Sequence, residues 1–451
     1  MSFKEFRFGK MPTHWESKRI IDYTEIVTDY VANGSFASLK ENVTYFEDPN
    51  YAVLIRLTDY NRGFDGQFVY IDEHAYNFLS KTQLFGGEII ISNVGANVGT
   101  VFKVPYLRKK MNLGPNSIMV KTKGNDDFYF YWFSSPNGQE SIKSILSGSA
   151  QPKFNKTSFR NLELPIPPYK EQKVIAHILS TLDDKIEVNN QINKTLENIA
   201  QVIFKQWFVD FEFPNEDGEP YKSSGGEMIA SELGMIPKGW EVISLDKIVD
   251  VKSGYSYKGT DLSESNNAMV TIKNFDRNGG YKKDGLKEII ISDRVKKHHY
   301  IEINDVVVAH TDLTQGAEII GNPVMVLSKG KYEKLIMSMD VVKVISKDND
   351  IDNAFIYCLL KTDNFKQYAL GYVNGTTVLH LSKKAIPQYK LPFPTDIKIC
   401  KELSAILKTI MMKISLSDNE NDNLNLTRDI LLPKLMSGEI RVPLDEEGDV
   451  S

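Results

Sequence analysis

The chain has 451 residues, 41% of them hydrophobic, and a formal net charge of −5. This length is enough for two or three domains with their own cores, and the charge speaks against a protein that binds nucleic acid by bulk positive charge alone. No apolar run approaches the ~20 residues of a membrane span, and the N-terminus lacks the apolar stretch of a signal peptide. Cys358 and Cys400 have no ligand-spaced neighbours, so the sequence predicts neither a zinc site nor a disulfide and fits a reducing cytoplasm.

The first segment, residues 1–168, has the pattern of a mixed α and β domain. Short apolar runs such as 88–92 are broken by Gly, Asn and Asp, which is typical of strands joined by turns. A helix is predicted at about 126–146, followed by a loop and a final strand near Leu164. The Pro-x-Pro after that strand forbids a helix and predicts a domain boundary.

A long helix is predicted next, from near Lys170 to about Phe211, within a helical segment at 169–212. Its apolar residues recur at spacings of three and four, which places them on one face. The predicted helix-pairing positions are Ile175, Leu179, Leu182, Ile186, Leu196 and Ile203, with Ile192 and Ile199 in the same pattern and Asn189 at a seam position between its two halves. Residues 213–236 are rich in Gly, Pro and Ser and predict a surface linker.

The remaining chain follows the same order. A second mixed segment at 237–394 contains a predicted strand at 305–309 and a predicted helix at about 352–370, and residues 443–451 form an acidic tail. The second helical segment, 395–442, has its predicted pairing positions at Leu403, Leu407, Ile410, Ile414 and Leu431. Because each helix alone would expose its apolar stripe to water, the two are predicted to pair as an antiparallel coiled coil. The alternative is two core helices of a larger domain, where a ~40-residue periodic helix is unusual.

Weak local matches indicate that the chain is one unit written twice. They keep the same order at a nearly constant offset in the sequence. The matched strings are Pro12–Glu16 with Pro237–Glu241, Val53–Arg62 with Val270–Asn278, Glu88–Ser92 with Asp305–Ala309, and Gly148 before Leu164–Pro167 with Gly375 before Leu391–Pro394. We therefore expect an α+β fold in which two duplicated mixed α/β domains are separated by two long helices.

The sequence carries no convincing catalytic or metal site. Ile166-Pro-Pro-Tyr169 is similar to the Pro-Pro-Tyr core of amino-methyltransferases, which place Asn, Asp or Ser before the prolines to accept a hydrogen bond from the target amine. Isoleucine cannot accept one, and no Gly-rich cofactor loop after a strand accompanies the motif. A Pro-rich elbow before a helix is the better interpretation. His298-His299 have no acidic or cysteine partners at metal spacing, so no metal ligand is predicted.

Two polar loops in each mixed segment carry donors and acceptors of the kind that read base edges. Gly95–Gly99 lacks the Gly-Lys-Ser/Thr of a phosphate-binding loop, and the second copy differs there more than a nucleotide-binding loop should. Gly148 and Gly375 would let the backbone approach a phosphate. A polar or capped turn is the alternative for each loop. The candidate DNA contacts are Asn93, Asn97, Ser149, Gln151, Lys153, Asn155 and Lys156 in the first copy, and Lys273, His310, Thr311, Asp312, Gln315, Asn374, Thr376, Thr377, His380 and Lys383 in the second.

The order of segments resembles that of type I restriction–modification specificity subunits. Three strings carry the resemblance, which covers nearly the whole chain: Leu164–Gln172 at the entry to the first helix, Trp207–Glu212 with the linker up to Trp240, and the tail Leu431–Ile440. One departure is that the second Pro-x-Pro is followed by Thr395-Asp-Ile-Lys in place of Glu-Gln, so the second helix is expected to start differently.

The resemblance implies a cytoplasmic DNA-specificity subunit with no catalytic site and no membrane contact. Each mixed segment would be a target-recognition domain that reads one half of a bipartite double-stranded DNA site. The helices would set the half-site spacing and dock two adenine-methyltransferase subunits, and motor–nuclease subunits would join for cleavage. The chain itself would bind no cofactor, because S-adenosylmethionine would sit in the methyltransferase and ATP and Mg in the nuclease.

Two other functions remain open from the sequence. An adenine methyltransferase-like enzyme would need a cofactor loop and an intact Asn/Asp-Pro-Pro-Tyr motif. A coiled-coil scaffold unrelated to DNA would not need duplicated domains with different polar loops.

Overall fold

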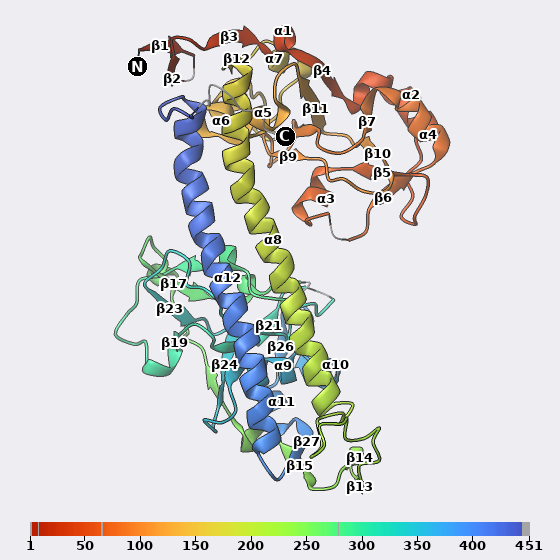
Figure 1. Cartoon of the computed structure of the whole chain (residues 1–451), viewed down its shortest axis with the longest axis vertical. Coiled ribbons are helices and arrows are strands. Elements are labelled where there is room, and N and C mark those ends of the chain that lie inside the picture. The colour runs from red at the N-terminus through yellow and green to blue at the C-terminus, as the bar shows by residue number, and fades with distance from the viewer. Residues whose placement is uncertain (1, 8, 65, 278, 315, 444–451) are drawn as a thin grey trace. The chain divides into compact units, whose positions relative to one another are not determined.

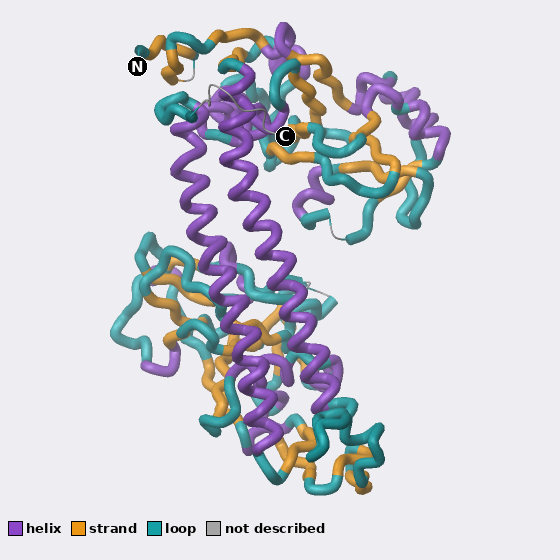
Figure 2. The backbone as a smooth tube through the Cα atoms, viewed as in Figure 1, coloured by secondary structure: helices purple, strands orange, loops and turns teal. Residues whose placement is uncertain are grey.

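The computed structural model describes residues 2–7, 9–64, 66–277, 279–314 and 316–443. The chain divides into two compact units, unit 1 with residues Met1–Lys185 and Leu424–Ser451, and unit 2 with residues Ile186–Asn423. Each unit holds one mixed α and β domain together with one section of each long helix, α8 (Tyr169–Phe208) and α12 (Lys398–Met436) (Figure 1; Figure 2). Among the described residues, no helix has the length and apolar character needed to span a membrane.

The mixed domain of unit 1 is built on two four-stranded sheets. The first sheet has the antiparallel order β4 (Thr24–Asp29), β11 (Ser117–Thr122), β8 (Ile89–Ser92), β9 (Val101–Lys103). The second has the order β6 (Val69–Ile71), β5 (Ala52–Ile55), β10 (Lys110–Leu113), β7 (Gln83–Leu84), with β5 and β10 parallel. A hairpin of β1 (Phe3–Phe6) and β2 (Gly9–Pro12) precedes the domain, and β3 (Glu16–Arg19) pairs with β12 (Glu163–Ile166) directly before α8.

The mixed domain of unit 2 repeats both sheets in the same order. The first has the antiparallel order β16 (Val249–Ser253), β24 (Val341–Ser346), β20 (Val306–Ala309), β22 (Pro323–Met325). The second has the order β18 (Lys287–Glu288), β17 (Asn267–Val270), β23 (Lys334–Met337), β19 (Tyr300–Ile301), with β17 and β23 parallel. As β3 does with β12, β15 (Trp240–Ser244) pairs with β27 (Lys390–Pro394) directly before the second long helix. The predicted duplication and the predicted strands at 88–92 and 305–309 are therefore confirmed.

The duplication extends into the segment that was predicted to be a surface linker. Within 213–236 the chain forms β13 (Met228–Ser231), which pairs with β14 (Gly234–Pro237) and corresponds to the β1–β2 hairpin of unit 1. Phe213 is buried and stacks on Trp240, with 5.4 Å between the ring centroids. The linker prediction is therefore wrong for these parts, because Gly, Pro and Ser content identified the turns and concealed the short strands between them.

The two helices predicted at 126–146 and 352–370 are each broken in two. The first consists of α5 (Asp126–Ser134) and α6 (Pro136–Lys143), and the second of α9 (Asn353–Leu360) and α10 (Asp363–Leu370). At each break a hydroxyl side chain caps the next helix: Ser135 accepts from the Gly138 amide, and Thr362 accepts from the Phe365 amide. A capping Ser or Thr has non-helical dihedrals, which ends the preceding helix.

The long helices run antiparallel within each unit. In unit 1, Ile175 and Leu179 of α8 belong to the same buried cluster as Leu435, with Leu431 packed against it. In unit 2, Leu403, Leu407 and Ile414 of α12 are buried with α8, and Leu196, Ile203 and Ile410 pack against them. The remaining predicted positions, Leu182 and Ile186, are half-buried.

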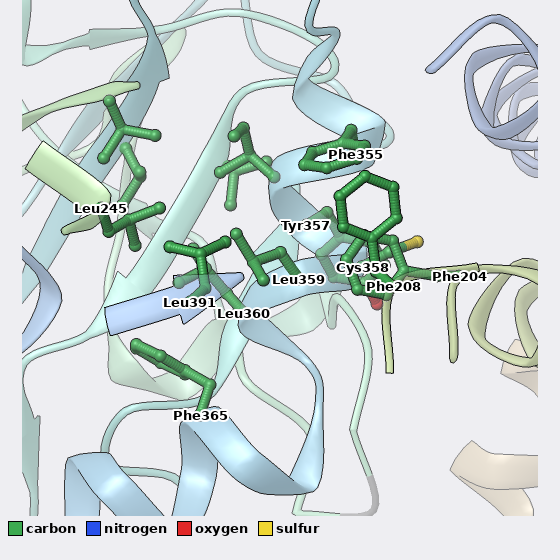
Figure 3. Close-up of a cluster of buried hydrophobic side chains, with 14 of the residues drawn as sticks. Phe204, Phe208, Leu245, Phe355, Tyr357, Cys358, Leu359, Leu360, Phe365 and Leu391 are labelled. Atoms are coloured by element: carbon green, nitrogen blue, oxygen red, sulfur yellow. The ribbon is translucent and has the colours of Figure 1, made fainter. Parts of the chain in front are cut away.

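Two positions of the predicted stripe on α8 face solvent. Ile192 and Ile199 are 42% and 43% exposed, whereas Ala200 and Phe204 are buried. A helix of 3.6 residues per turn drifts away from a strict seven-residue repeat, so the buried face moves past these two isoleucines. Phe204 and Phe208 of α8 instead pack edge-on against Phe355 of α9, with 5.2 and 4.9 Å between ring centroids (Figure 3). The stripe of α8 is therefore buried against the mixed domain as well as against α12.

Candidate nucleic-acid interface

In unit 1 the two predicted polar loops lie side by side. The Gly95 amide donates to the Pro152 carbonyl oxygen at 3.0 Å, and the Phe154 amide donates to the Asn93 carbonyl oxygen at 3.1 Å. Val94 and Lys153 form an antiparallel bridge between the same segments. Loops that are more than fifty residues apart in the sequence therefore form one continuous surface.

The candidate side chains of this surface divide into two groups. Asn97, Ser149, Gln151 and Lys153 are exposed. The other three stabilise the chain itself, although Asn155 is exposed as well: the Asn93 side-chain Nδ2 donates to the Phe154 carbonyl oxygen, Asn155 Oδ1 accepts from the Ser158 amide and caps α7 (Lys156–Arg160), and the Lys156 ammonium lies 2.8 Å from the Asp29 carboxylate. The first group is the part of this surface that is available for base or phosphate contacts.

Unit 2 joins its two candidate loops in a different way. Strands β21 (Thr311–Asp312), β26 (Leu379–Leu381) and β25 (Val373–Asn374) form a three-stranded sheet in that order. Here Asn374, Thr376, Thr377, His380 and Lys383 are exposed. His310 is half-buried, and its pKa is lowered by burial and by the nearby charges of Lys383 and His380. Its imidazole is thereby biased to the neutral form, which can both donate and accept a hydrogen bond.

Two predicted contacts in unit 2 are interior residues. Thr311 is 7% exposed and Asp312 is fully buried. Burial alone would raise the pKa of Asp312, but hydrogen bonds from Thr314, Ile319 and Ile320 lower it below its usual value. Thr311 and Asp312 therefore shape the loop and do not present their side chains to DNA, which corrects the prediction. Residue type alone does not show which polar side chains of a loop turn inward.

Two other candidates lie outside this sheet or outside the description. Lys273 is exposed and lies in the turn that directly follows β17, a strand of the other sheet of the domain. Gln315 lies outside the described residues.

The two glycines serve the turns in which they stand. Gly148 has φ +85° and Gly375 has φ +105°. A Cβ at Gly148 would lie 2.9 Å from the Gln151 carbonyl oxygen, and one at Gly375 would lie 2.2 Å from the Val378 carbonyl oxygen. Both copies therefore use glycine to fold the chain back on itself, which explains why these residues align between the copies.

Lys366 of α10 was not predicted from the sequence. Its ammonium group binds the loop after β20 through hydrogen bonds. It donates to the carbonyl oxygens of Ala317 and Ile320 and to Asn322 Oδ1. Nothing in the local sequence connects this lysine with a loop that lies more than forty residues earlier. The apolar Leu313, which is 65% exposed in the same loop, carries no donor or acceptor and so did not stand out in the sequence either.

Comparison with known proteins identifies the family. Residues 12–198 and 237–426 match the family described as the type I restriction modification DNA specificity domain, and the chain belongs to this family. It is 28% identical to the type I restriction enzyme MjaIX specificity subunit of Methanocaldococcus jannaschii, covering 98% of this chain and 96% of that protein. It is 27% identical to the HindI specificity subunit of Haemophilus influenzae, covering 74% of this chain and 80% of that protein.

A solved structure shares the fold. The S subunit of a type I restriction–modification system from M. genitalium superposes with a TM-score of 0.52 at 16% sequence identity, covering 94% of this chain and 96% of that chain. The α+β architecture with duplicated domains and two long helices is thus that of a type I specificity subunit.

Proposed function

We propose that this specificity subunit reads a bipartite double-stranded DNA site, with one half-site for each mixed domain. The observation that carries the proposal is that the two domains share one arrangement of sheets but expose different side chains on their loops. Both domains have the same two sheets in the same strand order, whereas the exposed loop residues differ, with Gln151 and Lys153 in one and Asn374 and His380 in the other. Such donors and acceptors discriminate base pairs in the major groove, so different sets support different half-sites.

The contacts that we assign to DNA are the exposed candidates that do not stabilise the chain itself, together with the half-buried His310. These are Asn97, Ser149, Gln151 and Lys153 in unit 1, and His310, Asn374, Thr376, Thr377, His380 and Lys383 in unit 2, with Lys273 as a candidate phosphate contact. Lysines among them suit phosphates, which position the protein, and amides and hydroxyls suit base edges, which specify the sequence.

The helices are proposed to dock two adenine-methyltransferase subunits and to set the half-site spacing. Val188, Ile192, Ile199 and Val202 of α8 are 48%, 42%, 43% and 54% exposed, and their spacing of four, seven and three residues follows one helix face. Motor–nuclease subunits are proposed to join the same complex for cleavage. An apolar face of this kind fits the groove of a partner protein better than it fits water.

The chain is proposed to contribute no catalytic group and no cofactor site. Ile166 lies in β12 opposite Glu16, and the following Pro167 carbonyl oxygen accepts a hydrogen bond from Gln172 Nε2 at 2.8 Å. The Pro-Pro-Tyr string therefore has a structural use as the elbow into α8. S-adenosylmethionine is assigned to the methyltransferase subunits, and ATP and Mg to the motor–nuclease subunits.

Reconstitution tests these assignments. The purified chain is mixed with the adenine-methyltransferase subunit encoded in the same genome, and methylation of a random-sequence duplex library is read by sequencing. We expect no methylation by the chain alone, two methyltransferase subunits per chain by mass measurement, and a methylated motif of two specific parts around a fixed gap. Methylation by the chain without a partner, or a continuous motif, would contradict the proposal.

A further inference from the structure

The loop that connects the last two strands in the order of the antiparallel sheet, β8 to β9 in unit 1 and β20 to β22 in unit 2, differs in length between the two domains. Eight residues, 93–100, separate β8 from β9, whereas thirteen residues, 310–322, separate β20 from β22. The loop of unit 2 is thus longer by five residues. It contains β21, which pairs with β26, the strand that carries the exposed candidate His380, so the longer loop adjoins the proposed reading surface.

A buried carboxylate organises this longer loop from inside. Asp312 accepts four hydrogen bonds, from the Thr314 amide at 2.7 Å, the Thr314 hydroxyl at 2.8 Å, the Ile319 amide at 2.8 Å and the Ile320 amide at 3.1 Å. Hydrogen bonds to a charged acceptor are stronger than those between neutral groups. The start and the end of the loop are therefore joined to one side chain.

A half-buried lysine fixes the same loop from the helical side. The Lys366 ammonium donates to the Ile320 carbonyl oxygen at 2.7 Å, to Asn322 Oδ1 at 2.7 Å and to the Ala317 carbonyl oxygen at 3.2 Å. Ala317 has a φ of +53°, a left-handed conformation that a non-glycine residue keeps only where its surroundings enforce it. The loop is consequently preorganised before any ligand binds.

Leu313 is a large apolar side chain that this loop, fixed by Asp312 and Lys366, exposes to solvent. It is 65% exposed and directly follows Asp312, which is fully buried, so its backbone position is fixed. The exposed side chains of the adjoining strands are polar, among them Asn374 and His380. At the corresponding place the shorter loop of unit 1 has Ala96, which is too small to reach as far.

We propose that Leu313 contacts the C5 methyl group of a thymine in the half-site read by unit 2, with Asp312 and Lys366 as positioning residues. The inference rests on the proposed DNA-reading function and names one specificity-determining contact within it. In the major groove the thymine methyl is the apolar group that a base edge presents, and leucine can bury it. A preorganised loop makes this contact without first losing conformational entropy.

The test removes one methyl group at a time from the DNA. Binding of the reconstituted complex with its methyltransferase subunits is measured at fixed salt on duplexes in which each thymine of the half-site is replaced by uracil. One replacement should weaken binding of the unchanged protein about fourfold, the effect of burying a single methyl group. Leu313→Ala should weaken binding to the thymine duplex roughly tenfold and abolish the difference between thymine and uracil at that one position.

Leu233→Ala is the matched control, because Leu233 is exposed in the β13–β14 hairpin of the same unit. It should keep the full thymine preference. Asp312→Asn should reduce the thymine preference at the same position, whereas a purely structural role would weaken binding to both duplexes equally. The assignment is overturned if Leu313→Ala retains the uracil effect, or if it changes DNA bending without any methyl dependence. A wild-type complex that selects no bipartite site would instead refute the proposed function.

Discussion

The two mixed domains share a frame but hold the loops that we propose to read DNA in different ways. In unit 1 the loops are joined backbone to backbone, through Gly95 with Pro152 and Asn93 with Phe154. In unit 2 buried or half-buried charges, Asp312 and Lys366, hold a longer loop. The strand order of the sheets is thus the same in both domains although the loops that connect the strands are held by different interactions. One chain can present two different surfaces because the frame fixes where a loop begins and ends, and the loop residues determine what it shows.

The domains also differ in how they are attached to the long helices. In unit 1 the Tyr131 hydroxyl donates to Asp183 of α8 at 2.6 Å, and Arg428 of α12 lies 2.8 Å from the same carboxylate. In unit 2 the Lys283 ammonium lies 2.9 Å from Asp418 of α12 and also pairs with Asp422. Burial alone would lower the pKa of Lys283, but the two carboxylates raise it above its usual value. This pairing with two carboxylates assigns Lys283 to the contact between the mixed domain and α12.

The largest difference between the units is expected from their two equivalent tryptophans. Trp15 and Trp240 are both buried, so replacing either with alanine should cost about 3–5 kcal/mol of local stability. Trp15 Nε1 donates to Glu171 at 2.9 Å, whereas Trp240 packs among aromatic rings, with Phe208 at 5.1 Å. Trp15→Phe should therefore cost about 1.5–3 kcal/mol more than Trp240→Phe. Hydrogen exchange of α5 and α9 measures each unit separately, and equal losses for the two phenylalanine variants would contradict this reading.

These tryptophans also show what the sequence predicts well. Trp15 and Trp240 stand in short strings that match between the copies, so the duplication and the order of elements followed from the sequence. Glu171 illustrates the limit, because its partner Trp15 lies 156 residues away. In the second copy Thr395-Asp-Ile-Lys follows the Pro-x-Pro, and the Trp240 side chain packs among aromatic rings instead.

The next largest effect concerns the polar layer between the helices of unit 2. Asn189 Nδ2 donates to Asn421 Oδ1 at 2.8 Å, and both residues are buried. Asn189→Ala should cost about 1–3 kcal/mol, because it leaves a buried acceptor without this donor. The matched Asn419→Ala changes an exposed residue of α12 and should have little effect. The corresponding helix section of unit 1 is apolar around Leu179 and Leu435, so hydrogen exchange should rise in unit 2 alone.

The reading loops show why the candidate site was harder to predict than the fold. Periodicity identified Leu179 and Leu403 because burial repeats along a helix. A loop has no such period, so Asp312 and His380 looked alike in the sequence although one is buried and the other exposed. Hydrogen bonds to distant backbone groups decide which polar side chain turns inward, and these depend on the whole domain.

A smaller effect is expected when one reading surface is changed and the other is left intact. Gln151→Ala with Lys153→Ala removes two exposed side chains from unit 1. Each lost base contact should cost ~1–3 kcal/mol of binding and relax one half-site. Sequencing of methylated library sites should show the other half-site unchanged. Asn374→Ala with His380→Ala is the reciprocal variant, and relaxation of the same half-site by both pairs would mean that the domains do not read separate halves.

The smallest expected effect is a change of gap with both half-sites intact. The units meet along the chain at Lys185–Ile186 in α8 and at Asn423–Leu424 in α12. Inserting four residues at both places lengthens each helix by roughly 6 Å, at ~1.5 Å per residue, and leaves the Asn189–Asn421 layer within unit 2 undisturbed. Since B-DNA rises ~3.4 Å per base pair, the preferred gap should grow by about one or two base pairs.

Insertion in α8 alone is the control for this lengthening. It shifts one apolar face against the other and should lower stability without giving a new preferred gap. Methylation of a library with varied gaps measures both variants. The added turn also rotates one helix section by about 40° beyond a full turn, so the doubly lengthened complex should work more slowly than the original. If it remains active and still prefers the original gap, the long helices do not set the spacing of the site.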